Sequence, residues 1–311
     1  MKVKAAVLRE CGKPLPYVNS LPLSIEEVEL DPPQSGEVLV QIKAAGLCHS
    51  DLVAINGERA KPVPMVIGHE ASGIVSKVGP DVYGLAVGDH VVPVYVANCG
   101  RCDMCQEGRP ALCQPATIAN KAGTLIDGTT RLHSDGQIIF HHSGVAAFSE
   151  YAVISQNALV RIDPEIPFEV AALFGCAVVT GVGSVVNTAK VSPGQSVAIV
   201  GLGGVGLNAL LAAVMSGAGQ VVAVDAKEKK LKIASQFGAH DTFNTNIENC
   251  VDKILAVTDG GVHFAFETAG VSPALDLAYK ITRRGGTTIV AGMPGPDASI
   301  MLSHLSLSAE E

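Results

Sequence analysis

A glycine-rich turn at residues 201–206 constrains the fold of this chain more than any other sequence feature. It follows an apolar run at 196–200 and opens a helical stretch at 205–216. In such a turn the first glycine permits a tight bend, the second lets the backbone approach a pyrophosphate, and the third lets the helix pack on the strand. The helix N-terminus directs its partial positive charge at the phosphates. The residues assigned to the cofactor in this turn are Gly201, Gly203, Gly204, Val205 and Gly206.

An acidic residue follows at the spacing of a dinucleotide site. Asp225 closes the next apolar run, about 20 residues after the turn. Its carboxylate can accept hydrogen bonds from an adenosine ribose and would repel a 2′-phosphate, so the pattern favours NAD over NADP. Lys230 is a candidate second ribose contact. The alternative is a glycine turn in an unrelated α/β sheet with Asp225 as a helix cap, but the order of strand, turn, helix and acid favours the nucleotide.

The chain divides into two regions of different pattern. Residues 1–155 are rich in Val, Gly and Pro, with short alternating runs such as 38–42 and 73–78, which predicts a mostly β domain of the small-barrel type. From residue 165 onward, strands alternate with helices up to a last strand at 286–291, which predicts a parallel, doubly wound sheet. We therefore expect two domains, 1–160 and 161–311. We expect the polar stretch 120–144 to be a surface excursion, and 298–302 to be an edge strand.

Composition argues against several classes of partner. The net charge is −8 and the pI is near 5.6, so neither nucleic acid nor an anionic membrane surface is expected. The N-terminus lacks the apolar region of a secretory signal, and the apolar stretches 171–186 and 209–224 are too short and too interrupted to predict membrane spans. The chain has 8 cysteines. Without a signal peptide these indicate reduced, metal-binding thiols and a cytoplasmic protein.

Four of those cysteines lie close together in a Cys-x2-Cys-x2-Cys-x7-Cys pattern. Cys99, Cys102, Cys105 and Cys113 are the ligand set of a closed tetrahedral zinc site, which staples a loop with little core of its own. An iron–sulfur cluster is an alternative, because Cys-x2-Cys-x2-Cys also begins ferredoxin motifs, but the seven-residue gap disfavours it. Unmetallated thiols are the third interpretation. We expect the lobe at 95–115 to hold structural zinc.

Three further candidate ligands are dispersed along the chain. Cys48 lies in Gly-Leu-Cys-His-Ser-Asp, His69 in Gly-His-Glu, and Cys176 in Gly-Cys-x3-Thr-Gly. Taken singly, these residues could equally be an inert thiol, a turn histidine and a buried core thiol. Together, two thiolates and one imidazole predict an open metal site of the catalytic type.

The run 68–73, Gly-His-Glu-Ala-Ser-Gly with Gly79 six residues on, resembles the zinc signature of the zinc-dependent medium-chain alcohol dehydrogenases. The four-cysteine lobe, the segment 175–181 and the turn at 201 occur in that family's order, so the resemblance covers almost the whole chain. It implies an α/β protein with an N-terminal GroES-like catalytic barrel, a Rossmann domain for NAD, and two zinc ions per chain. It also implies hydride transfer between an alcohol and an aldehyde or ketone, and a homo-oligomer, either a dimer or a tetramer.

The resemblance assigns roles around the metal. Cys48, His69 and Cys176 would bind the catalytic zinc, the set that the family is known for. Asp51 would orient His69 through its ring N–H, and Glu70 would lie just behind the metal.

Proton transfer and nicotinamide contacts are implied in the same way. Ser50 would take the alcohol proton and start a relay toward solvent. Some relatives place a histidine three residues later, where this chain has Val53, so the last base is missing or supplied by His49, which would also face the cofactor phosphates. Thr180 would contact the nicotinamide, and the backbone at Gly292 would meet its carboxamide.

Three alternatives concern activity and substrate. Family chains continue beyond 302–307 into a sixth strand and a return into the first domain, so we expect this chain to be C-terminally truncated and impaired in turnover. A catalytically impaired zinc- and nucleotide-binding fragment is one alternative function, and a relative acting on a polyol or a thiol-adduct alcohol is another. Tyr95 and His142 resemble pocket-lining positions, or are ordinary loop residues.

Overall fold

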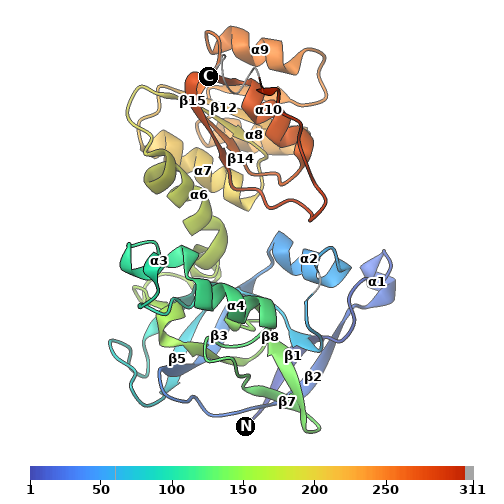
Figure 1. Cartoon of the computed structure of the whole chain (residues 1–311), viewed down its shortest axis with the longest axis vertical. Coiled ribbons are helices and arrows are strands. Elements are labelled where there is room, and N and C mark those ends of the chain that lie inside the picture. Colours follow the sequence, from blue (N-terminus) through green and yellow to red (C-terminus); the bar gives the residue numbers. More distant parts are fainter. Residues whose placement is uncertain (60, 305–311) are drawn as a thin grey trace. The chain divides into compact units, whose positions relative to one another are not determined.

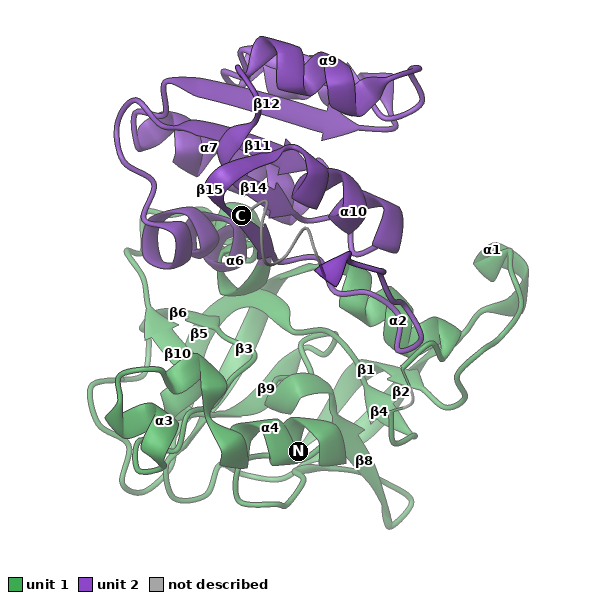
Figure 2. Ribbon diagram, turned by 45° about the horizontal axis from the view of Figure 1, so that its top comes forward, with its two compact units in different colours: residues 1–176 green, residues 177–311 purple. Residues whose placement is uncertain are grey.

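The chain folds into two compact units, Met1–Cys176 and Ala177–Glu311 (Figures 1 and 2). The structure is a computed structural model that describes residues 1–59 and 61–304. The division falls after Cys176, whereas the sequence predicts a domain boundary after residue 160. Each unit has its own clusters of buried apolar side chains.

Unit 1, Met1–Cys176, is built from two β-sheets. Five strands close into a barrel in the order β1-β2-β7-β8-β4, and five more form a sheet in the order β10-β6-β5-β3-β9. Small and β-branched side chains fill both interiors, as suits a pleated, half-buried surface. This confirms the predicted β domain. The strands are β1 (Lys2–Leu8), β2 (Leu23–Leu30), β3 (Glu37–Gly46), β4 (Met65–Val66), β5 (Glu70–Val78), β6 (His90–Pro93), β7 (Leu132–Ser134), β8 (Gln137–His141), β9 (Tyr151–Ser155) and β10 (Leu159–Arg161).

The polar stretch 120–144 belongs to this barrel, so the expected surface excursion is wrong. β7 and β8 pair with each other, β7 also pairs with β2, and β8 pairs with β4. Leu132 and Ile139 are fully buried, whereas their neighbours His133 and Ile138 are partly and largely exposed. One face of the hairpin therefore packs in the barrel while the other meets solvent.

Two helices of unit 1 end at a glycine in the left-handed conformation. α2 starts directly after Cys48, and Gly57 ends it in the left-handed conformation with φ of 79°. α4 has a proline in its first turn and ends at Gly123 with φ of 70°, the usual proline-first, glycine-last asymmetry. The helical elements are α1 (Tyr17–Ser20), α2 (His49–Asn56), α3 (Asp103–Gln106), η1 (Pro110–Leu112), α4 (Gln114–Ala122), η2 (His142–Gly144), η3 (Gln156–Ala158), α5 (Phe168–Ala171) and η4 (Phe174–Val178).

Within the described residues, one helical run has the length and apolar composition of a membrane span. This run, Phe168–Ala189, contains α5, η4, α6 (Val179–Gly183) and η5 (Ser184–Ala189). One such helix is weak grounds for a membrane, because core helices of other proteins share its composition. Protein packs closely against it: a Cβ on Gly175 would lie 2.1 Å from the carbonyl oxygen of Pro93, and a Cβ on Gly181 would lie 2.4 Å from that of Val205.

Unit 2, Ala177–Glu311, contains one five-stranded parallel sheet. Its order is β13-β12-β11-β14-β15, and apolar clusters lie on both of its faces, which confirms the predicted doubly wound sheet. No strand follows β15 within residues 291–304, so the expected edge strand at 298–302 is wrong. The remaining elements are β11 (Ser196–Val200), α7 (Gly204–Met215), β12 (Gln220–Asp225), α8 (Glu228–Gln236), β13 (Asp241–Asn244), α9 (Cys250–Val257), β14 (Val262–Glu267), α10 (Ser272–Lys280) and β15 (Thr282–Val290).

Candidate metal centres and nucleotide site

The three dispersed ligand candidates meet within unit 1. Cys48 is the residue that caps α2 after strand β3, and His69 sits in the short connection between β4 and β5. Cys176 lies in η4, a single π-helical turn, a local irregularity that often marks functional positions. Three separate backbone elements therefore bring the two thiols and the imidazole together.

The distances in this cluster fit a tetrahedral zinc ion. The Sγ atoms of Cys48 and Cys176 are 3.9 Å apart, and two sulfurs bound tetrahedrally to one zinc at 2.3 Å would be separated by about 3.8 Å. One donor atom from each of Cys48, His69, Glu70 and Cys176 lies within 4.8 Å of all the others. The donor set and its spacing therefore fit the metal that the sequence predicts.

Two polar side chains hold the donors in place. Nδ1 of His69 lies 3.1 Å from Oδ1 of Asp51, so Nε2 is the ring nitrogen left for a metal. Oδ2 of Asp51 accepts the backbone N–H of Cys48 at 2.9 Å. The hydroxyl of Ser50 donates to Sγ of Cys48 at 3.2 Å and lies 3.4 Å from Nε2 of His69. Ser50, the predicted proton acceptor, thus places its hydroxyl beside two of the donor atoms.

The electrostatics of these side chains favour a thiolate–imidazolium pair. The hydrogen bond from Cys176 lowers the pKa of Cys48 to about 3, against the effect of burial. Burial would lower the pKa of His69, but its bonds to Asp51 and Cys48 raise it to about 10. The thiolate of Cys48 and burial raise the pKa of Cys176 well above its usual range. A cation would replace the proton of His69 as the positive charge beside Cys48.

Glu70, predicted to lie just behind the metal, has a carboxylate oxygen within 4.8 Å of the other donor atoms. Its side chain is buried, and burial together with the thiolate of Cys48 raises its pKa. Gly46 pairs with Glu70 between β3 and β5, and a Cβ on Gly46 would lie 2.5 Å from Oε2 of Glu70. A glycine in this strand therefore makes room for the carboxylate.

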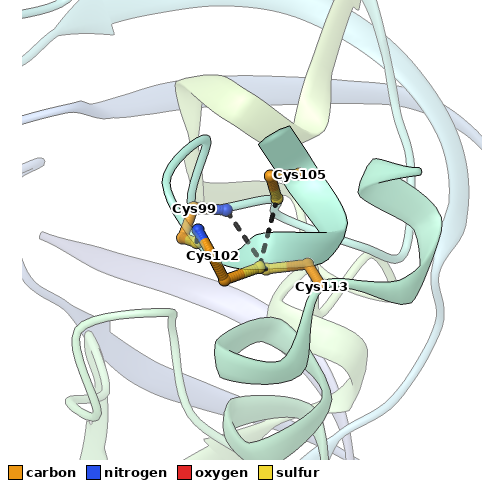
Figure 3. Close-up of side chains that lie close together, drawn as sticks. All are labelled: Cys99, Cys102, Cys105 and Cys113. Carbon is orange, nitrogen blue, oxygen red and sulfur yellow. Dashed lines mark hydrogen bonds between the residues drawn. The ribbon is translucent and has the colours of Figure 1, made fainter. Parts of the chain in front are cut away.

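The four predicted lobe cysteines also gather at one point (Figure 3). Sγ of Cys102 lies 3.5 Å from that of Cys105 and 3.9 Å from that of Cys113. Backbone N–H groups point at the sulfurs: Cys99 donates to Sγ of Cys113 at 3.3 Å, and Cys102 donates to Sγ of Cys99 at 3.3 Å. Such donors stabilise thiolates, and the N–H of Arg101 lowers the pKa of Cys99 to about 6. The lobe fits a closed four-thiolate zinc site.

The glycine turn of unit 2 has the close contacts that its pattern predicts. Gly201 has φ of 99° and lies against Ala269, where a Cβ would come within 2.7 Å of the backbone nitrogen. A Cβ on Gly206 would lie 1.9 Å from the carbonyl oxygen of Gly201. Gly203 caps α7 and has open space around it, as a backbone that must approach phosphate requires. Gly204 and Val205 form the first turn of α7.

Asp225, at the end of β12, is hydrogen-bonded to the glycine turn at 201–206. Its carboxylate accepts the N–H of Leu202 at 2.8 Å and of Lys227 at 2.9 Å, and Nζ of Lys230 lies 3.2 Å away. Burial would raise the pKa of Asp225, but these donors lower it below its usual value. The structure therefore places an ionised carboxylate, with Lys230 beside it, at the carboxyl edge of the sheet.

Sequence reasoning missed one residue of this edge, Glu267. Its side chain is 1% exposed, and Oε1 accepts the N–H groups of Ala269 and Gly270, each at 2.7 Å. Its backbone oxygen accepts the N–H of Gly292 at 2.9 Å. Glu267 thus ties the loop beside Gly201 to the segment predicted to meet the carboxamide. The available signal was an acid at the carboxyl end of the expected strand 263–267.

The remaining predicted positions lie apart from these clusters or near their edge. Thr180 lies in α6, whose Gly181 packs on α7. His49 is exposed at the first position of α2, so its phosphate role stays a prediction. The ring of Tyr95 meets that of His69 edge to face, with centroids 6.3 Å apart. His142 is 2% exposed and lies beside Asp51.

Comparisons with known proteins agree with this arrangement. Residues 34–164 match the family described as "Alcohol dehydrogenase GroES-like domain", and residues 204–309 match "Zinc-binding dehydrogenase". The S-(hydroxymethyl)glutathione dehydrogenase of Synechocystis sp. (strain ATCC 27184 / PCC 6803 / Kazusa) is 40% identical over 304 residues, which cover 96% of this chain and 80% of that protein.

Solved structures give the same result. The benzyl alcohol dehydrogenase of Acinetobacter calcoaceticus superposes with a TM-score of 0.91 at 34% identity, covering 99% of this chain and 81% of that one. A zinc-binding dehydrogenase of Sinorhizobium meliloti 1021, bound to NADP, superposes with a TM-score of 0.80 at 25% identity, over 99% and 81% of the two chains.

The chain belongs to the zinc-dependent medium-chain alcohol dehydrogenase family. It is an oxidoreductase with a GroES-like barrel and a Rossmann unit, and its cofactors are zinc and a nicotinamide dinucleotide.

Proposed function

We propose that this enzyme interconverts an alcohol and its aldehyde or ketone at a zinc ion held by Cys48, His69 and Cys176, with NAD as the hydride carrier. The single observation that supports the metal assignment most directly is the 3.9 Å separation of the two cysteine sulfurs beside a buried histidine. Zinc in such a site acts as a Lewis acid on an alcohol or carbonyl oxygen. The four-cysteine lobe holds a second, structural zinc ion.

The residues of the chain supply orientation and a proton path. Asp51 holds the ring of His69 so that Nε2 faces the thiols. Ser50 places its hydroxyl beside the donor atoms, where it accepts the proton of a bound alcohol and passes it on. With Val53 where some relatives have a histidine, the relay either ends at Ser50 or continues to His49, whose side chain is exposed to solvent. The carboxyl group of Glu70 lies within 4.8 Å of the donors, where its ionised form would attract a bound cation.

Zinc content and alcohol turnover test the proposal together. The full chain should bind two zinc ions, and Cys48→Ser should bind one and lose NAD-dependent oxidation of benzyl alcohol. Cys11→Ser is the matched control, because Cys11 belongs to neither metal cluster. A chain that binds zinc and NADH but turns over no alcohol would instead favour the fragment that binds without catalysis. Equal zinc content in the parent and Cys48→Ser would refute the metal assignment.

Preference for NAD over NADP is a separate part of the proposal. A 2′-phosphate would face the ionised carboxylate of Asp225, and like charges in contact disfavour binding. Lys230 is already paired with that carboxylate. We expect NADH to bind at least about tenfold more tightly than NADPH. Asp225→Ser should reduce the ratio of the two dissociation constants. Fluorescence titration of both nucleotides measures it, and a parent chain without preference would contradict the assignment.

The names of two similar proteins indicate which substrates to test. S-(hydroxymethyl)glutathione and benzyl alcohol are the substrates in the names of two similar proteins. A panel of benzyl alcohol, ethanol, a polyol and S-(hydroxymethyl)glutathione, compared by kcat/KM, identifies the preferred class. We also propose that the protein is cytoplasmic and that it forms a homo-oligomer, either a dimer or a tetramer. Sedimentation measures the oligomeric state.

A further inference from the structure

One buried histidine of the metal centre has no role in the proposed function. His142 follows β8 in η2, and 2% of its surface is exposed. Its Nδ1 lies 3.0 Å from Oδ1 of Asp51, the same oxygen that lies 3.1 Å from Nδ1 of His69. The two imidazole rings meet edge to face, with centroids 5.2 Å apart and planes at 87°. Two imidazole nitrogens therefore face one oxygen of a fully buried carboxylate, Nδ1 of His69 in a hydrogen bond and Nδ1 of His142 in close contact without hydrogen-bond geometry.

A strained turn holds His142 in this position. Ser143 and Ala146 have φ of 53° and 57°, in the left-handed region that disfavours residues with a Cβ. Gly144 between them has φ of 66°. Backbone strain of this kind persists only where surrounding contacts over-determine it, and it gathers at functional sites.

Backbone hydrogen bonds join the same turn to the residues just before His69. The N–H of Ala147 donates to the carbonyl of Gly68 at 2.9 Å, and the N–H of Phe148 donates to that of Ile67 at 2.9 Å. Gly68 has φ of 92°, and a Cβ there would lie 2.4 Å from the ring of Phe148. The turn at 142–148 therefore restrains His69 through its backbone and, by way of Asp51, through its imidazole.

We propose that His142 is a positioning residue for the metal ligand His69. Its ring packs edge to face against that of His69 and occupies the space 3.0 Å from Oδ1 of Asp51, while the N–H of Cys48 holds Oδ2 at 2.9 Å. The imidazole of His69 and the carboxylate therefore cannot turn away from each other. This inference rests on the proposed zinc site. Removing a partner in the shell around metal ligands weakens metal affinity by about 10- to 100-fold.

Zinc release tests this role without depending on turnover. His142→Phe keeps a ring and removes the nitrogen that faces Asp51, whereas His142→Gln restores an N–H group. His141→Phe is the matched control, because His141 is equally buried but its Nε2 accepts the N–H of Arg131 at 3.1 Å. Each zinc-loaded protein is mixed with an excess of a chromogenic chelator. Release from the four-cysteine lobe serves as the internal reference in every trace.

We expect His142→Phe to release the Cys48–His69–Cys176 zinc about 10- to 100-fold faster than the parent, with the lobe unchanged. His142→Gln should fall between the two, and His141→Phe should leave both release rates unchanged even where it lowers the melting temperature. If His142→Phe does not fold, His142→Gln carries the comparison alone.

Unchanged release from both His142 variants would overturn the proposal, and so would equal acceleration by His141→Phe, which indicates general loosening. The proposed zinc site fails in a different way, through an unchanged zinc count in Cys48→Ser. The two failures are therefore distinguishable.

Discussion

The two metal centres of unit 1 contain similar donor atoms but are built in opposite ways. The lobe draws four sulfurs from residues 99–113, and short turns with backbone N–H donors are enough to bring them together. The dispersed centre draws Cys48, His69 and Cys176 from a helix cap, a strand connection and a π-helical turn. In the lobe, cysteine sulfurs would fill all four coordination positions of a tetrahedral metal ion. The dispersed centre leaves room beside three ligands for chemistry.

The two centres also differ in how tightly the surrounding protein packs. Around His69 the carboxylates of Asp51 and Glu70 are buried, and the neighbouring backbone admits no added Cβ at Gly46 or Gly68. In the lobe, Gly100 has nothing within 4 Å of an added Cβ. A site that must hold ligands at one geometry for catalysis is thus packed tightly, whereas a structural staple tolerates an open surround.

The largest expected effect separates catalysis from stability. Cys48→Ala should lower kcat at least about 1000-fold, because a Lewis acid contributes several kcal/mol of transition-state stabilisation. Cys105→Ala should lower the melting temperature instead, because metal binding at a closed site is part of the folding free energy. Steady-state kinetics and calorimetry on both variants measure this. A loss of kcat at constant stability in Cys105→Ala would contradict the division of roles.

The next effect is the pH dependence of zinc binding at the dispersed centre. With the pKa of Cys48 near 3, that of His69 near 10 and that of Cys176 raised, the metal-free site carries protons on His69 and Cys176 at neutral pH. Zinc must displace both, so its apparent affinity should rise about 100-fold per pH unit between pH 6.5 and 8.5 and fall by the same factor on acidification.

Chelator competition across that pH range measures the slope, and calorimetry in buffers of different ionisation enthalpy counts the protons. Cys48→Ser, which retains only the lobe, supplies the signal to subtract. A slope near zero would mean that the donors bind without losing protons.

The smallest effect compares two glycines with positive φ. Gly68→Ala combines a φ of 92° with a clash against Phe148 and should lower the free energy of unfolding by about 2–4 kcal/mol. Gly100→Ala has a φ of 69° and open space, so it should cost only about 1 kcal/mol. Urea unfolding of both variants tests the difference, and equal losses would show that packing around His69 is no tighter than in the lobe.

Much of unit 2 could be predicted because its signals are local. The glycine turn, the acid at Asp225 and the alternation of strands and helices all depend on residues close in sequence. The parallel sheet confirms the alternation, and Asp225 is hydrogen-bonded to the turn. The polar stretch 120–144 was assigned wrongly because its strands are short and pair with residues far away, such as β2 and β4. Nothing local marks a strand that takes its partners from the far end of a domain.

The sequence by itself determined the donor types, the four-cysteine lobe and the nucleotide turn, because these depend on residue chemistry and on spacing within a few turns of chain. The tertiary structure alone decided that the sulfurs of Cys48 and Cys176 lie 3.9 Å apart, that the carboxylate of Glu70 lies beside them, and that His142 packs against His69 and Asp51. Convergence of this kind depends on the barrel and its second sheet, which bring together residues far apart in sequence. Long-range packing therefore sets it, and no short stretch of chain records it.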